Sequence, residues 1–271
     1  MNIERNFLEN ANNIVAENSF KSRKEVKRSL IDKLFLGSRI YFVIRYMMII
    51  LKMSSLAKKD KYNYNEFILH AILCFKLLEE VGAKFDIEGI DNIKKVKDEP
   101  VVFVGNHMSA LETMILPGII LPIKNVIFVV KKSLLTFPVF GHIMRKTKPI
   151  AVGRVNPREG IEILKSGTSI IIFQQSHRNP NFDPEVFSSL GVKLAQKAGV
   201  KVVPFALKTD FWGNSKLVRD FGPIRRKEKV HFAFDEPMEI KGNGKENNEQ
   251  IIKFINENLK KWGHNPNPDS L

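Results

Sequence analysis

The stretch "VVFVGNHMSALETMIL", residues 101–116, places a histidine and a glutamate directly after an apolar run. An imidazole can take up a proton near neutral pH, and a carboxylate can hold its second nitrogen, so His107 and Glu112 are candidates for acid–base chemistry. The spacing alone is weak evidence, because a second such pair, His231 and Glu236 in "HFAFDE", occurs in the same chain. The alternative is a histidine that merely ends a buried strand, and the context must decide.

Composition limits the class of protein. The chain has 271 residues and 44% hydrophobic residues, enough for one large domain or a domain with an appendage. Its net charge of +14 predicts anionic partners, namely phosphates, nucleic acid or acidic lipid headgroups, although a lysine-rich soluble protein is the alternative. The one cysteine, Cys74, lies among apolar residues and is expected to pack in a reducing compartment. The first 25 residues lack the features of a signal peptide.

The N-terminal third carries the most apolar segment, residues 34–57. Arg39, Arg45 and Lys52 interrupt it, and a cation at mid-bilayer is costly, so we predict a helix that lies in the membrane interface. A second apolar stretch, residues 67–81, is expected to pack back on the first. The alternative is two ordinary helices that cover a sheet. We therefore expect a basic and apolar membrane-associating region over residues 1–82, an α/β domain over 83–263 and a loose tail over 264–271.

The rest of the chain alternates apolar, β-branched runs with helix-like segments. This pattern predicts an α/β fold with a central, mainly parallel or mixed sheet flanked by helices. Non-alternating runs such as "SIIIF" are typical of strands buried on both faces. The expected strands are Lys84–Glu88, Pro100–Val104, Val126–Lys131, Ile150–Val152, Ser169–Phe173, Lys201–Leu207 and Lys229–Phe234, and the expected helices lie near 110–120, 157–165, 186–198 and 248–262.

Polar and cationic residues follow several of these strands. His107, Lys131, Arg154 and the segment Gln174–Arg178 each come directly after an apolar run. Functional groups of α/β folds gather at the carboxyl ends of strands, so we expect a base beside several phosphate-sized cations. The sequence has no glycine-rich nucleotide loop and no Cys/His spacing typical of a metal site.

The ordered blocks resemble those of the PlsC-like glycerolipid acyltransferases, from about residue 85 to 240. The family's N-H-x-S-x-x-D block corresponds to Asn106–Glu112, with Glu in place of Asp. "KKSL" and "PVFG" match its next block, Gly153-Arg154 its arginine block, and Val203-Pro204-Phe205 its V-P block. The F-P-E-G-T-R block corresponds to Phe173–Arg178. His231 and Glu236 lie outside these blocks, and "VHFAF" alternates like a strand.

The resemblance implies transfer of a fatty acyl group from a thioester to the hydroxyl of a lysophospholipid, with 1-acylglycerol-3-phosphate as the family's usual acceptor. His107 would be the base and Glu112 its carboxylate, and cations would hold the acceptor's phosphate. The implied substrate-binding residues are Lys131, Arg154, Gln175 and Arg178, and further candidates are Ser109, Arg158, His177 and Pro204. Acyl-CoA or acyl carrier protein would be the co-substrate, with no bound cofactor and no metal.

The third block departs from the family, because Gln175 and Ser176 replace its glutamate and glycine. This leaves open a different lysolipid or lipid-like alcohol as acceptor, and a non-catalytic lipid-binding relative. The expected partners are an anionic bilayer surface and an acyl carrier, at the cytoplasmic face of a membrane as a peripheral or monotopic protein. No nucleic-acid motif accompanies the charge, so we expect no nucleic-acid partner.

Overall fold

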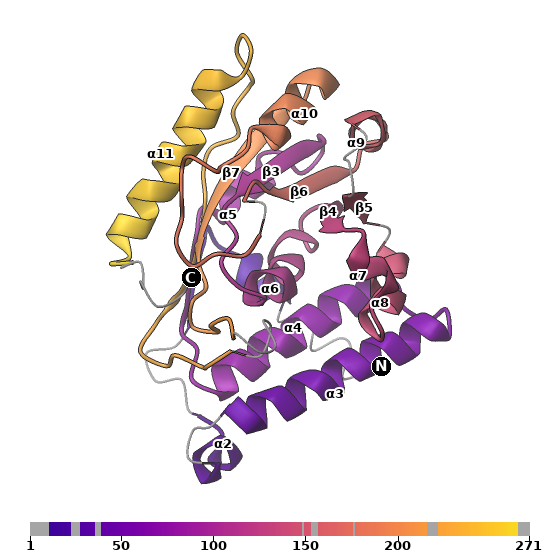
Figure 1. Ribbon diagram of the computed structural model, residues 1–271, viewed down its shortest axis with the longest axis vertical. Coiled ribbons are helices and arrows are strands. Elements are labelled where there is room, and N and C mark those ends of the chain that lie inside the picture. The colour runs from indigo at the N-terminus through magenta and orange to yellow at the C-terminus, as the bar shows by residue number, and fades with distance from the viewer. Residues whose placement is uncertain are drawn as a thin grey trace.

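The computed structural model describes residues 11–22, 28–35, 39–147, 149–152, 157–175, 177–215 and 222–264 (Figure 1). Within these residues one sheet joins eight strands in the order β1-β2-β8-β7-β3-β6-β4-β5. The strands are β1 (Ser19–Lys21), β2 (Phe85–Glu88), β3 (Val101–Gly105), β4 (Val126–Lys131), β5 (Ile150–Val152), β6 (Ser169–Phe173), β7 (Lys201–Lys208) and β8 (Val230–Phe234). The expected α/β class is confirmed, and each predicted strand is present to within one residue at either end.

The sheet is mixed. Five neighbouring strands, from β7 through β3, β6 and β4 to β5, run parallel, whereas β7 pairs antiparallel with β8. The carboxyl ends of the five parallel strands therefore lie along one edge, where the sequence places its polar residues. Strand β1, which pairs antiparallel with β2, was not predicted, because "SFK" is short and lies in a polar region.

The central strands are apolar because both of their faces are covered. Every residue of β3 is buried, and so are the first four of β6, as expected for non-alternating runs. Gly105 ends β3 where the chain passes close to β7. A Cβ at this position would lie 2.3 Å from a ring carbon of Phe205 and 2.5 Å from its carbonyl oxygen. Glycine therefore lets residues 106 and 107 leave the sheet close beside the end of β7.

Helices cover both faces of the sheet (Figure 1). Helices α10 and α11 pack on β3 and β7, and α6 lies on the other side, between the sheet and α4. The long helices are α3 (Arg39–Lys58), α4 (Tyr64–Glu80), α6 (Leu111–Ile120), α9 (Pro157–Lys165), α10 (Leu190–Ala198) and α11 (Lys245–Lys261). Helices α2 (Leu30–Leu34), α5 (Ile90–Lys94), α7 (Ser133–Thr136) and α8 (Phe140–Thr147) are too short to show a clear sequence period.

The two apolar N-terminal helices form a pair, as expected. Helix α4 packs on α6, and α3 packs on α4 and α8. Phe42 and Tyr46 of α3 meet Trp212 edge to face, with ring centroids 4.7 and 5.0 Å apart, which fixes α3 to the loop after β7. Cys74 is buried in α4, and burial raises the pKa of its thiol to about 12, consistent with a packing residue.

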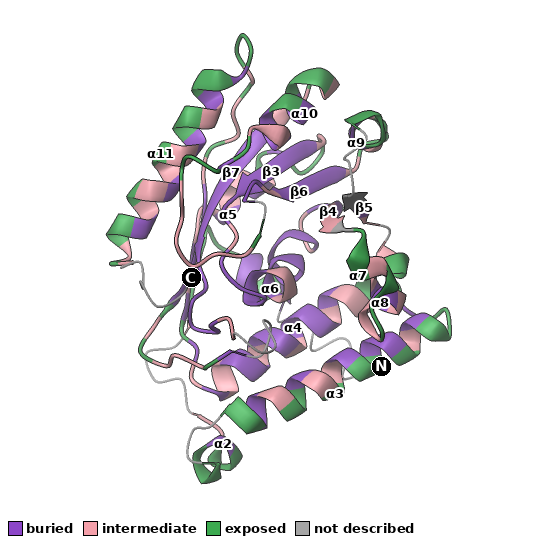
Figure 2. Ribbon diagram, in the orientation of Figure 1, coloured by how far each residue is buried: buried purple, intermediate pink, exposed green. Residues whose placement is uncertain are grey.

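The side of α3 that faces away from the protein carries an apolar stripe as well as exposed cationic residues. Ile40, Ile44, Met48 and Leu51 recur every three or four residues, and each is at least half exposed. Exposed stretches recur along α3 (Figure 2). Among the described helices, α3 is the one whose length and composition would allow it to cross a bilayer. Its other side is buried in the protein, so α3 presents a lengthwise apolar stripe.

Helix α2 is turned with its polar side inward. Asp32 is fully buried, accepts a hydrogen bond of 2.8 Å from Nε of Arg28 and contacts Nη2 of Arg226 at 3.0 Å. Four apolar side chains of this segment, those of Leu30, Ile31, Leu34 and Phe35, are exposed. A buried ion cluster thus orients a short helix so that it adds apolar surface near the start of α3.

The proposed boundary at residue 82 stays a prediction. Strand β1, from the N-terminal region, adds to the sheet of the α/β domain, and α4 covers α6. The last helix packs against β7, and Ile251, Ile255 and Leu259 are its buried apolar residues.

His231 and Glu236 do not form a pair, in agreement with the sequence interpretation. The ring of His231 stacks on Trp262, with centroids 4.9 Å apart, while Glu236 forms an ion pair with Lys95 at 2.5 Å. Burial lowers the pKa of His231 to about 4, although Asp86 opposes the shift. The folded state therefore keeps this imidazole neutral.

This lowered pKa predicts acid sensitivity. Below the ordinary pKa of about 6.5 the unfolded chain takes up a proton at His231, whereas the folded chain resists it until about pH 4. Stability is therefore full above pH 6.5 and falls as the pH drops towards 4. Between pH 7 and pH 5 the free energy of unfolding of the wild type, measured with urea, should fall by about 1–2 kcal/mol more than that of a His231→Gln variant. Equal losses in both proteins would contradict this assignment.

Candidate active site

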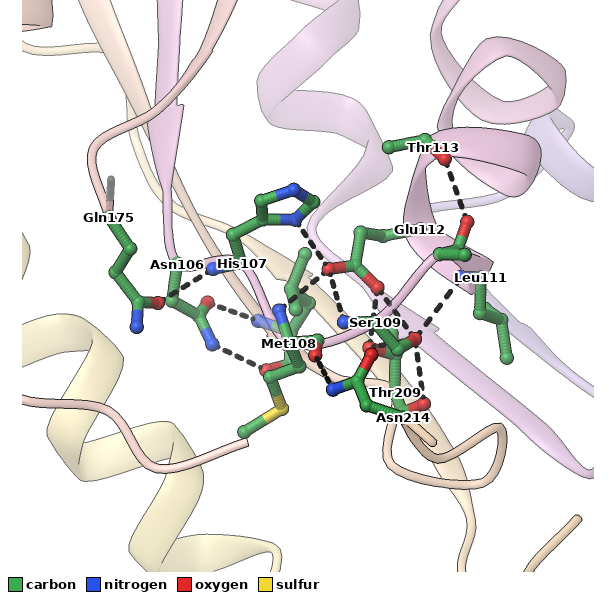
Figure 3. A network of polar contacts seen from close by, with 12 residues as sticks. Asn106, His107, Met108, Ser109, Leu111, Glu112, Thr113, Gln175, Thr209 and Asn214 are labelled. Carbon is green, nitrogen blue, oxygen red and sulfur yellow. Dashed lines mark hydrogen bonds and ion pairs between the residues drawn. The ribbon is translucent and has the colours of Figure 1, made fainter. Parts of the chain in front are cut away.

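A buried carboxylate at the start of α6 holds the strand end of β3 in place. Glu112 is fully buried, and its Oε1 accepts hydrogen bonds from the backbone N–H groups of Met108 and Ser109 at 2.7 and 2.8 Å (Figure 3). The same oxygen lies 2.8 Å from Nδ1 of His107. The carboxylate thus reaches back to the residues before its helix, where the helix N-terminus also favours negative charge.

The second oxygen of Glu112 ties this loop to β7. The hydroxyl of Thr209, the residue after β7, donates to Oε2 at 2.6 Å, and the hydroxyl of Ser109 lies 3.0 Å from the same oxygen. Ser109 also lies 3.0 Å from the Thr209 hydroxyl. Both carboxylate oxygens therefore have protein partners, as a buried charge requires.

These contacts set the charge of the pair. Burial alone would raise the pKa of Glu112. The hydrogen bond and charge of His107, together with hydrogen bonds from Thr209 and Ser109, outweigh the effect of burial and hold the pKa below its ordinary value. An ionised carboxylate can only accept, so Nδ1 of His107 carries the hydrogen. Nε2 of the neutral ring is then left as a lone-pair acceptor.

Further contacts fix the backbone and ring of His107. Its N–H donates to Oε1 of Gln175 at 2.7 Å, and its ring stacks on Phe173, with centroids 4.2 Å apart. Asn106 exchanges two side-chain hydrogen bonds with the backbone of Leu207, at 2.8 and 2.9 Å. The histidine is therefore held by the ends of β3, β6 and β7 together.

His107 borders a largely apolar cavity of about 460 Å³. Its walls come from α3, α4, α6, β4 and α8, with Ile50, Met114, Phe128 and Ile143 among the apolar residues. The His107 side chain is 16% exposed, enough for a bound molecule to reach the ring. The arrangement is a base at the wall of a site that fits an apolar chain.

The structure brings some of the predicted substrate-binding residues together. Gln175, His177 and Arg178 line the same cavity as His107. Lys131 ends β4 at the same edge of the sheet, but its side chain lies outside the described part of the chain. Arg154 lies outside the described residues. Ser109 contacts the carboxylate of Glu112 and lies outside the cavity lining.

Two further candidates are not brought to the site. Arg158 is exposed on α9 and is absent from the cavity lining. Pro204 is buried within β7, opposite Val104 of β3, four residues before the strand ends. Its position within the strand indicates that Pro204 packs in the sheet interior and does not contact a substrate.

Sequence reasoning missed Thr209. Thr209 follows β7 directly. Functional groups of α/β folds gather at the carboxyl ends of strands, so its position was the signal that could have identified it. The stacking of Phe173 on His107 has no local sequence signal, because the two residues come from different strands. Among the described residues, no group of three or more His, Cys, Asp or Glu side chains could hold a metal ion.

Two departures in the third block, Gln174 and Gln175, form hydrogen bonds next to the end of β3, whereas Ser176 lies outside the described residues. Gln175 replaces a glutamate, and its amide oxygen accepts from the His107 backbone as a carboxylate oxygen would. Gln174 replaces a proline and donates its backbone N–H to the carbonyl of Gly105 at 3.1 Å, which proline cannot do. Gln174 and Gln175 therefore join the end of β6 to the end of β3 through hydrogen bonds to Gly105 and His107.

Comparisons with known proteins agree with this geometry. The family described as Acyltransferase matches residues 84–208. A 1-acyl-sn-glycerol-3-phosphate acyltransferase of Pseudomonas aeruginosa is 34% identical over 153 residues, which cover 53% of this chain and 57% of the relative. A chloroplastic 1-acyl-sn-glycerol-3-phosphate acyltransferase of Arabidopsis thaliana is 30% identical over 133 residues, or 46% of this chain and 36% of the relative. The matched segment thus spans only part of each relative.

A solved structure is similar over most of the chain. The crystal structure of the 1-acyl-sn-glycerophosphate acyltransferase PlsC from Thermotoga maritima superposes with a TM-score of 0.62 at 25% identity. The match covers 87% of this chain and 98% of that one.

The Thr209 hydroxyl is predicted to stabilise the buried carboxylate. In a Thr209→Val variant the free energy of unfolding, measured with urea, should fall by about 1–3 kcal/mol, because Glu112 loses a buried hydrogen-bond donor. The pKa of Glu112 should also rise. Since the pKa of Glu112 is lowered in the folded chain, this stabilisation is present at neutral pH and declines as the pH falls below 4.5. The matched control is Thr136→Val, whose exposed hydroxyl donates to the Ser133 carbonyl. Equal effects of both substitutions would contradict the prediction.

Proposed function

We propose that the chain acts as a member of the PlsC-like acyltransferase family, which its match over residues 84–208 supports, and that it transfers a fatty acyl group from a thioester to a lysophospholipid hydroxyl in phospholipid biosynthesis. One observation carries the proposal. Nδ1 of His107 is held by the buried Glu112 at 2.8 Å, while the ring borders a largely apolar cavity. A positioned base beside room for an acyl chain is what this reaction needs.

The chemistry follows from the tautomer. Nε2 of His107 accepts the proton of the acceptor's hydroxyl as that oxygen attacks the thioester carbonyl. The new ester bond forms, the carbon–sulfur bond breaks, and the proton passes from the imidazolium to the departing thiolate. Glu112 stabilises the imidazolium through Nδ1–H and stays ionised throughout.

The cavity supports assignments for both substrates. Its apolar walls suit the acyl chain, which arrives on coenzyme A or on an acyl carrier protein, so no resident cofactor is required. Arg178 lines the cavity and is the proposed ligand of the acceptor's phosphate, with Arg154 and Lys131 as further candidates from the sequence. We assign 1-acylglycerol-3-phosphate as the acceptor. The neutral Gln175 in place of glutamate favours another lysolipid as the second candidate.

Removal of the base tests the reaction. The His107→Ala variant should lose about 10²- to 10⁴-fold in acyl transfer from a labelled thioester to 1-acylglycerol-3-phosphate, because the hydroxyl loses its proton acceptor. Its circular dichroism spectrum should stay that of a folded chain. The matched control is His142→Ala, which removes a histidine of α8 that lies outside the cavity lining. Full turnover by the His107 variant would refute the proposal.

The exposed apolar stripe supports a bilayer as partner. The side chains of Ile40, Ile44, Met48 and Leu51 are exposed on α3, which contacts α2, whose Leu30, Ile31, Leu34 and Phe35 are also exposed. Arg45 and Lys52 are also exposed on α3, where they can meet anionic headgroups. We propose that α3 lies in the interface at the cytoplasmic face, because its other side is buried against the protein.

Polar substitution of the stripe tests this orientation. The double variant Ile44→Gln/Met48→Gln should bind anionic vesicles about tenfold to hundredfold more weakly, because two apolar side chains no longer enter the bilayer. The control, Lys245→Gln/Lys253→Gln, removes two exposed charges from α11 and should change binding little. If only the α11 variant lost affinity, general charge attraction would replace α3 as the explanation.

A further inference from the structure

The loop after β7 contacts the candidate active site at two points. Residues 209–214 lie just beyond the segment that the acyltransferase family matches. At the start of the loop, the Thr209 hydroxyl donates to Oε2 of Glu112 at 2.6 Å. At its end, Nδ2 of Asn214 donates to the carbonyl oxygen of Met108 at 3.0 Å (Figure 3). The loop therefore supplies two hydrogen-bond donors that hold the site.

The contact of Asn214 reaches the chain between the base and its carboxylate. The N–H of Met108 donates to Oε1 of Glu112 at 2.7 Å, while the carbonyl of Met108 accepts from Asn214. His107 directly precedes Met108, and its Nδ1 lies 2.8 Å from the same Oε1. A displacement of Met108 would therefore change the distance between the imidazole and the carboxylate.

The middle of the loop packs on α3 and not on the site. Trp212 is buried, and its ring meets those of Phe42 and Tyr46 edge to face, with centroids 4.7 and 5.0 Å apart. The cavity lining among the described residues includes none of Trp212, Phe42 and Asn214. These three side chains can therefore affect the reaction only through the residues that they hold.

The packing of Trp212 fixes the positions of both donors. Edge-to-face aromatic contacts have a preferred geometry, so they orient the loop as well as bury it. Protein interiors are close-packed and transmit displacements to their neighbours. A change in how α3 meets Trp212 must therefore move Thr209 and Asn214, which lie on either side of it in a short loop.

We propose that Trp212 is a positioning residue through which α3 controls the geometry of His107 and Glu112. Packing of α3 on Trp212 keeps the donors of the loop in place, and loss of that packing loosens them. This inference rests on the proposed acyl transfer and adds a control of the same site to it. Because the other side of α3 carries the exposed apolar stripe, one helix links the surface proposed to meet a bilayer with the base.

The test compares the same substitution in two neighbouring helices of the full-length protein. Phe42→Leu removes a ring that meets Trp212. The control, Phe75→Leu, removes a buried ring of α4 that packs on Phe20 and Phe85, and neither phenylalanine lines the cavity. Phe42→Leu should lower kcat about tenfold to hundredfold with little change in KM, because a small displacement of a catalytic group is costly. Phe75→Leu should leave kcat near the wild-type value.

A spectroscopic readout separates positioning from a general loss of stability. The proton on Nδ1 of His107, hydrogen-bonded to Glu112, should give a downfield proton resonance in the wild type. This resonance should move upfield in Phe42→Leu, because the hydrogen bond weakens, and stay in place in Phe75→Leu. Equal effects of both substitutions on the resonance and on kcat would overturn the inference.

Asn214→Ala tests the link at the site without opening the core. Asn214 is partly exposed, and its loss removes the donor to the Met108 carbonyl, so kcat should fall about tenfold. Since both changes act through one loop, the double variant Phe42→Leu/Asn214→Ala should lose little more than the more affected single variant.

Two results would contradict this link. A wild-type kcat in Asn214→Ala would overturn the inference even if Phe42→Leu failed to fold. Losses that multiply in the folded double variant would show that the two residues act independently, and would overturn it as well. Absence of acyl transfer by the wild type would instead refute the proposed function.

Discussion

The buried carboxylate of Glu112 is the interaction on which the site depends. It lies at the start of α6 and accepts hydrogen bonds from two backbone N–H groups, an imidazole and the Thr209 hydroxyl. An ionised group without these donors would be too costly to bury, so the loop after β3 and the end of β7 must both be in place. The contacts that stabilise the charge of Glu112 also fix the tautomer of His107. The stability of the fold and the acid–base chemistry therefore depend on the same carboxylate.

The parallel part of the sheet supplies the framework for this constraint. Residues 106–107, 173–175 and 209 are distant in sequence, but they lie at the carboxyl ends of β3, β6 and β7, which are neighbours in the sheet. Gly105 lets the central strand end close against β7. On one side of this framework, α4, α3 and α6 contribute to a cavity that the histidine borders, and α3 turns an apolar stripe outward. The base, the apolar chain site and the proposed membrane face are therefore parts of one arrangement.

The sequence predicted the features that have a local pattern. Buried strands, the α3–α4 pair and the carboxyl-end placement of His107 and Gln175 follow from apolar runs and what comes after them. The inward polar side of α2 could not be predicted, because Asp32 finds Arg226 almost two hundred residues away.

The most direct measurement of the central claim is the pair of ring-nitrogen chemical shifts of His107 in the ¹⁵N-labelled, full-length protein. The structure predicts a protonated Nδ1, hydrogen-bonded to Glu112, and an unprotonated Nε2. A His107 ring with its hydrogen on Nε2 would contradict the account, because that tautomer cannot accept the proton of an attacking hydroxyl.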